Sequence, residues 1–203
     1  MKKIVAVFST FLFLFTFPVI ALSDENSSSG TAVEVVEILN ATFLECMKRG
    51  DELGYSGRYD LLEPVMKRYF AFSYMVRKSS GSYWNKFDSN EQQQLLEKYI
   101  TWSVGRYAQR FKKYKGQQFQ ILSSKLVKNK YMVVISQIVK EKKDPRVFKY
   151  ILLENDGVWQ IVDIQVSGIS QLSLLRSQFK SLLKKKGVVE LLFILDEKIS
   201  QLN

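Results

Sequence analysis

The most constraining feature of this sequence is the block from residue 117 to residue 166, where apolar residues recur with a period of two. It is rich in β-branched and aromatic residues and predicts four strands, at about residues 119–125, 131–140, 146–154 and 158–166. Turn residues separate the strands at 128–129, 144–145 and 155–157, and the last of these turns, Asn155-Asp156-Gly157, is a strong hairpin signal. Connections this short join antiparallel neighbours, so we expect an antiparallel meander.

Helical patterns precede the strand block. Thr31 and Glu34 form a predicted capping box, and the apolar residues after them recur every three or four positions until Gly50. A turn is expected around Gly54, followed by one or two short helices that are broken near Pro64.

The longest predicted helix begins at Ser89, where Gln92 completes a capping signature, and continues for about 26 residues until Gly116. After the strands, Ser170 is expected to cap another helix, which Gly187 interrupts before a final amphipathic segment. These patterns predict an α+β fold in which a four-stranded antiparallel sheet packs with amphipathic helices.

The second predicted strand is apolar on both faces. Val133 and Ile135 point to one side, whereas Met132, Val134 and Ile138 point to the other. A sheet covered on one side only does not need this pattern, so one face is expected to look onto something other than a tightly packed core.

The first residues have the pattern of an export signal. Lys2 and Lys3 precede an apolar run that continues to Ile20, and small residues suit a cut after Ala21. We therefore expect a signal peptide at 1–21, a linker at 22–30 and a single domain at 31–203. The alternative is an uncleaved anchor, because the run is near the lower limit of a membrane span. Both alternatives place the domain outside the cytoplasm.

The chain of 203 residues contains no histidine and one cysteine, Cys46. This composition excludes Ser-His-Asp and Cys-His nucleophile pairs, imidazole bases and histidine-ligated zinc or haem. One cysteine forms neither an intrachain disulfide nor a thiolate cage, and the helical pattern around Cys46 predicts a small core residue. We expect no cofactor, no metal and no enzymatic role. The formal net charge of +10 indicates a basic surface, but export argues against nucleic acid as the partner.

Several tracts carry a resemblance to a known family. They are Tyr83-Trp84, Gln92 to Gln94, Tyr107, the strand Gly157-Val158-Trp159-Gln160-Ile161-Val162-Asp163-Ile164, then Gly168, Ser170, Arg176-Ser177-Gln178-Phe179 and Gly187. Together they resemble the toluene-tolerance family, the MlaC-like periplasmic phospholipid-binding auxiliary proteins of ABC transport. The tracts at residues 53–60 and 169–172 look closer to its hopanoid-associated branch.

The resemblance implies a curved sheet and helices that enclose an apolar cavity, in a nuclear-transport-factor-like fold. It implies a soluble monomeric carrier that moves phospholipid, or a hopanoid-type lipid, between the outer and inner membranes. The implied partners are an outer-membrane lipoprotein complex and an inner-membrane ABC transporter with an MCE subunit. The alternative is an adaptor that binds this transporter without carrying lipid.

The expected lipid-binding residues are apolar and aromatic positions on the predicted helices and strands, and ordinary core packing is the alternative for each one. They are Phe70, Phe72, Met75, Leu96, Ile100, Val104, Tyr107, Val133, Ile135, Tyr150, Leu152 and Ile161.

Three polar residues each have two interpretations. Arg176 and Lys180 lie four residues apart on a predicted helix, and they either bind an anionic head group or belong to a solvated basic face. Asp163 is expected to be a partly buried carboxylate paired with a cation such as Arg176. A catalytic base like that of ketosteroid isomerase is the alternative, but it also requires oxyanion donors.

Overall fold

The computed structural model describes residues 31–202. The expected signal peptide and linker lie outside the described residues. The helices are α1 (Ala32–Lys48), α2 (Gly50–Tyr69), α3 (Phe72–Ser80), the 3-10 turn η1 (Gly81–Lys86), α4 (Ser89–Arg110) and α5 (Gln171–Ser200). The strands are β1 (Gln118–Val127), β2 (Tyr131–Lys140), β3 (Lys143–Asn155), β4 (Val158–Val166) and β5 (Ile169–Ser170). None of the described helices is long and apolar enough to cross a membrane.

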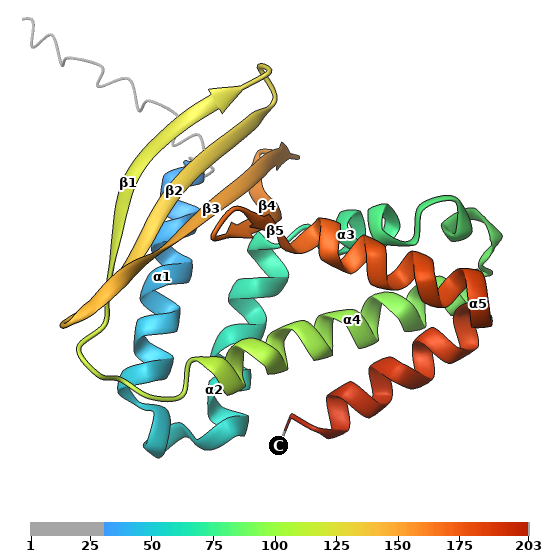
Figure 1. Cartoon of the computed structure of the whole chain (residues 1–203), viewed down its shortest axis with the longest axis horizontal. Coiled ribbons are helices and arrows are strands. Elements are labelled where there is room, and N and C mark those ends of the chain that lie inside the picture. Colours follow the sequence, from blue (N-terminus) through green and yellow to red (C-terminus); the bar gives the residue numbers. More distant parts are fainter. Residues whose placement is uncertain (1–30, 203) are drawn as a thin grey trace, which may run out of the picture.

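The sheet is an antiparallel meander in the order β1-β2-β3-β4-β5 (Figure 1). The predicted strand count of four was wrong, because the two-residue strand β5 pairs with the end of β4 through Val166 and Ile169. A strand this short leaves no alternating pattern to detect.

The turn between β2 and β3 was also predicted in the wrong place. It lies at residues 141–142, where Lys142 has a φ of 60°, and Asp144 and Pro145 belong to β3. The register shifts between Ile138 and Lys140, so the ladder is irregular opposite Pro145. A proline is tolerated within a sheet at such a bulge, since it has no amide to donate there.

The first helix begins as predicted. Thr31 Oγ1 accepts a hydrogen bond from the amide of Glu34 at 3.2 Å, and the amide of Thr31 donates to the Glu34 carboxylate at 2.6 Å. The break predicted near Pro64 was wrong, because α2 continues through Pro64 and its backbone departs from helical geometry at Gly54, with a φ of 61°. Glycine takes this left-handed conformation without steric cost.

The two longest helices agree with the sequence except at their ends. The N-cap of α4 is Asp88 rather than Ser89, and α4 ends at Arg110, well before Gly116. Ser170 caps α5, as predicted, by accepting from the amide of Ser173 at 3.0 Å. Gly187 interrupts α5 with a φ of 79°, so its second half turns back along α4 (Figure 1).

Two clusters of buried apolar residues organise the molecule, and α4 contributes to both. The larger cluster joins α1, α2 and the sheet through Leu39, Leu62, Met66, Val134 and Leu152. The smaller cluster joins α3, the start of α4 and α5 through Val76, Leu95, Leu175, Phe179, Leu183, Leu191 and Leu195. The sheet and α1 therefore stand at one end of the long axis, and the α5 turn lies at the other (Figure 1).

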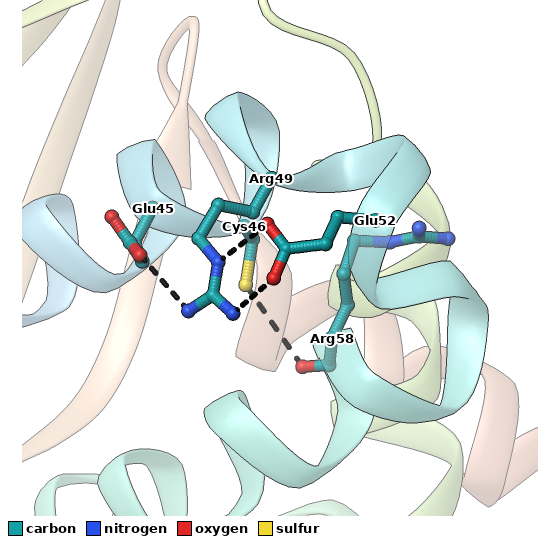
Figure 2. Close-up of polar contacts among 5 residues, drawn as sticks. All are labelled: Glu45, Cys46, Arg49, Glu52 and Arg58. Carbon is teal, nitrogen blue, oxygen red and sulfur yellow. Dashed lines mark hydrogen bonds and ion pairs between the residues drawn. The ribbon is translucent and has the colours of Figure 1, made fainter.

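A buried arginine ties α2 to the end of α4. Arg58 is only 6% exposed, and its guanidinium donates to the carbonyls of Gly50 at 2.6 Å and Ala108 at 2.8 Å. The Cys46 thiol lies 3.9 Å from the carbonyl oxygen of Arg58 (Figure 2). Cys46 is buried, as predicted, and burial raises the pKa of its thiol to about 11.

Candidate functional site

A cavity of about 350 Å³ lies between the inner face of the sheet and α4. Its lining comes from nearly every element of the larger cluster: Phe43, Phe70, Phe72, Met75, Tyr99, Ser103, Arg106, Tyr107, Gln109, Arg110, Phe111, Phe119, Phe148, Tyr150, Asp163, Ile164, Val166, Gln171 and Leu172. Sites for small ligands span about 300–1,000 Å³, so this cavity is at the lower end of that range.

The sheet contributes one side of the cavity through register. Phe148 pairs with Val166, and Tyr150 pairs with Ile164. Alternate residues of a strand share a face, so Phe148 and Tyr150 on β3 point the same way as their partners on β4. The predicted alternation of apolar residues is what makes this wall.

The helical side of the cavity is aromatic. The ring of Phe43 stacks on Phe111 at 4.1 Å and on Tyr107 at 5.2 Å, between ring centroids. Tyr107 lies on the last turn of α4 and Phe111, four residues on, is its C-cap, so they face the same side. Phe70 packs edge-on against Tyr107 at 6.1 Å. These contacts hold the aromatic rings in place along this wall of the cavity.

The tyrosines of the cavity are uncharged. Desolvation raises the pKa of Tyr99 to about 12, and it also raises the pKa values of Tyr107 and Tyr150. All three hydroxyls therefore remain protonated near neutral pH. The interior presents rings and neutral hydroxyls, which suit an apolar occupant better than an ionic one.

The cavity opens at the last two turns of α4. Arg106, Gln109 and Arg110 are the exposed members of the lining. The Arg106 guanidinium lies 4.7 Å from the centroid of the Trp102 ring. Within residues 31–202, neither arginine forms an ion pair. The opening therefore carries two cations beside an apolar interior.

Asp163 also lines the cavity and is half-buried. Its Oδ1 accepts a hydrogen bond from the amide of Leu172 at 3.0 Å, at the first turn of α5. The expected pairing with Arg176 was wrong, because the described residues include no ion pair of Asp163. A helix N-terminus has free amides that satisfy a carboxylate as well as a cation does.

The structure divides the twelve expected lining residues into three groups. Phe70, Phe72, Met75, Tyr107 and Tyr150 line the cavity. Leu96, Ile100, Val104, Leu152 and Ile161 pack in or against the larger cluster without reaching the cavity. Val133 and Ile135 flank the buried Val134 and point to the opposite face of the sheet, where they are half-buried. Ligand contact remains a prediction for each of them.

Sequence reasoning missed the arginines at the opening. Arg176 and Lys180 are exposed on α5 and lie outside the lining, whereas Arg106 and Arg110 belong to it. Arg106 and Arg110 are four residues apart, and each directly precedes an aromatic lining residue, Tyr107 or Phe111. This spacing was detectable in the sequence as a sign of cations beside the lining. Cations in a final helical turn are also expected simply to offset the macrodipole.

The site does not bring together the groups of a metal centre or a general acid–base pair. Within the described part of the chain, no three acidic, cysteine or histidine side chains are placed to hold a metal ion. Asp163 is the one carboxylate of the described lining, and it is hydrogen-bonded to a backbone amide. The arrangement provides a partly open, mainly apolar cavity with two exposed arginines in its lining.

The family model for the MlaC protein matches residues 38–197. The chain belongs to the MlaC family. This confirms the resemblance seen in the sequence, although nothing in the match separates the hopanoid-associated branch. Among solved structures, the chain is similar to the phospholipid-binding protein from Ralstonia solanacearum in complex with a phospholipid. The TM-score is 0.74 at 20% sequence identity, over 86% of this chain and 98% of that one. The likeness shows that the two share the α+β fold. No curated protein sequence matches the chain.

Proposed function

We propose that this MlaC-family protein binds a phospholipid. An acyl chain of the lipid is held in the cavity, and its head group lies at the opening. The observation that carries the proposal is the cavity itself, whose lining includes the exposed Arg106 and Arg110 and the half-buried Gln171 and Leu172. Membership of the MlaC family and the bound phospholipid of the Ralstonia solanacearum protein support it.

The energetics of an acyl chain explain why such a cavity is needed. Each buried methylene is worth about 0.8 kcal/mol, so a chain of roughly 15 methylenes costs about 12 kcal/mol to expose to water. The cavity must only approach the apolar environment of a bilayer for loading to be reversible. A methylene is about the size of a water molecule, which occupies about 30 Å³. The cavity of about 350 Å³ therefore accommodates about twelve methylenes, which is most of one chain. A second chain requires the walls to move apart.

The head group is assigned to Arg106 and Arg110. Both guanidiniums are exposed at the opening, and arginine forms paired charge-assisted hydrogen bonds to phosphate oxygens. Arg176 and Lys180, the residues expected from sequence, lie outside the lining and are the weaker candidates. A hopanoid-type cargo would make less use of these cations than a phospholipid.

The wider role follows from the family. Under this proposal the protein is exported, loses residues 1–21, keeps the linker 22–30 and works in the periplasm as a monomer through the domain 31–203. It carries lipid between the membranes and exchanges it with an MCE-type ABC transporter and an outer-membrane lipoprotein complex. A non-carrier adaptor of that transporter is the second candidate, and bound lipid is what separates the two.

The test is native mass spectrometry of the protein purified from its own cell envelope. A carrier retains a lipid that dissociates on activation in the gas phase, and the lipid mass identifies phospholipid or hopanoid. An adaptor carries none and takes none from labelled vesicles. The same spectrum reads the processed N-terminus, which cleavage after Ala21 places at Leu22.

A further inference from the structure

Two large apolar side chains are exposed beside the opening of the cavity. Ile169 is 55% exposed and Leu174 is 45% exposed. Ile169 pairs with Val166, which lines the cavity. Leu174 follows the lining residue Gln171 by three positions on α5, so both lie on the same side of the helix. The β5–α5 side of the opening is therefore apolar and in contact with solvent.

The α4 side of the same opening is cationic. Arg106 and Arg110 are exposed, and within residues 31–202 no carboxylate forms an ion pair with either of them. Asp163, the nearby acid of the lining, already accepts the amide of Leu172. We call Arg106, Arg110, Ile169 and Leu174 the rim.

We propose that the rim docks on the surface of a lipid bilayer that contains anionic head groups. The inference rests on the proposed function. Ile169 and Leu174 enter the boundary between head groups and acyl chains, and Arg106 and Arg110 meet the anionic lipids. Apolar side chains beside cations are the combination that holds peripheral proteins at such an interface.

The path of the cargo favours a bilayer as the occupant of this surface. A lipid that passes directly between the cavity and a bilayer exposes its methylenes to water unless the opening lies against that bilayer. The rim surrounds that opening on its apolar and its cationic side. The charge pattern also fits. Within residues 31–202 no carboxylate forms an ion pair with Arg106 or Arg110, so both cations are available to anionic lipids.

The experiment measures binding of the full exported protein to vesicles by flotation. We compare vesicles of phosphatidylcholine alone with vesicles that contain phosphatidylglycerol as well. Binding is expected with phosphatidylglycerol and is expected to weaken as salt is added. Replacing Arg110→Gln should weaken it about fivefold, as expected for one cation at an anionic surface. No binding to the anionic vesicles overturns the proposal.

Matched variants locate the contact. The double variant Ile169→Asp and Leu174→Asp should lose at least about tenfold in binding, and Ile169→Ser with Leu174→Ser should lose less. Val189 is 74% exposed on the second half of α5, beyond the turn at Gly187, so Val189→Asp should bind like the unaltered protein. Equal loss in Val189→Asp, with the double variant still folded, assigns the contact to that turn and overturns the proposal.

The outcome is separable from the carrier function. Lipid content is read by native mass spectrometry on the same samples. A protein that carries lipid but does not bind anionic vesicles overturns the rim proposal alone. A protein that binds vesicles through the rim but never contains lipid overturns the carrier function alone. Normal vesicle binding by the double variant, with loss of binding only to membranes that contain envelope proteins, assigns the rim to a protein partner and overturns the bilayer proposal.

Discussion

The backbone amide of Leu172 donates to Asp163 Oδ1 over 3.0 Å, and both residues line the cavity. The bond joins the end of β4 to the first turn of α5. That turn would otherwise have an unsatisfied amide at the edge of an apolar space. Asp163 thus positions the first turn of α5 beside the cavity, which is a different role from the cation partner or catalytic base considered from sequence.

Removing the Asp163 acceptor should destabilise the fold modestly. We expect Asp163→Ala to lower the free energy of unfolding by about 1–2 kcal/mol, because the amide of Leu172 loses its partner. Asp163→Asn keeps an oxygen in place and should lose less. Urea unfolding of the three proteins measures this, and equal losses in both variants would show that the charge rather than the acceptor matters.

Arg58 should matter far more than Arg49, although both lie at the junction of α1 and α2 (Figure 2). Arg58→Ala leaves the carbonyls of Gly50 and Ala108 without their buried donor, so we expect a loss of about 2–4 kcal/mol in urea unfolding. Arg49 pairs with Glu45 and Glu52 in solvent, and Arg49→Ala should change stability little. Similar effects of the two substitutions would contradict the role of Arg58 in tying α2 to the end of α4.

Stability should fall at alkaline pH. The pKa of Tyr99 is raised from 10.0 to about 12 and that of Cys46 from 9.0 to about 11, so both are neutral in the folded protein at pH values where they ionise in the unfolded chain. Below pH 9 neither group lowers the stability of the fold. As the pH rises between a group's unfolded and folded pKa values, that group lowers the free energy of unfolding by up to about 1.4 kcal/mol per pH unit. Thermal unfolding from pH 8 to pH 12 measures the slope, which Tyr99→Phe should reduce. An unchanged slope in that variant would assign the loss to other groups.

A pair of strand positions distinguishes the cavity from the outer face of the sheet. Val166 and Ile135 are both half-buried β-branched residues, but Val166 lines the cavity and Ile135 points to the opposite face. Val166→Asp should reduce lipid uptake from labelled vesicles at least about tenfold, because it introduces a charge beside the acyl chain. Ile135→Asp should retain uptake. If Ile135→Asp loses lipid uptake while circular dichroism shows a folded protein, the lipid binds on the outer face of the sheet instead.

The sequence was sufficient for features that depend on local chemistry. The Thr31–Glu34 capping box, the Asn155-Asp156-Gly157 hairpin and the interruption at Gly187 are determined by neighbouring residues, and the structure contains each one. Pro64 and Pro145 were misjudged. Pro64 itself is exposed inside α2, between the buried Leu62 and Met66, and Pro145 is exposed where the β2–β3 register shifts, so neither proline ends its element.

The cavity lining was only partly predictable. Periodicity identified which residues face inward, so Tyr107 and Tyr150 were placed correctly on inner faces. It could not tell where packed neighbours leave space, because Val104 and Leu152 share that inward character and are fully buried away from the cavity. The roles of Arg106 and Arg110 depend on which end of α4 meets the opening, and this is fixed by the fold rather than by the helix itself.

The central claim is that the cavity holds lipid, and native mass spectrometry of the protein from its own envelope tests it most directly. We predict a lipid adduct on the unaltered protein and on Ile135→Asp, and its loss from Val166→Asp. A folded, unaltered protein without any lipid, which also takes none from labelled vesicles, would contradict the account.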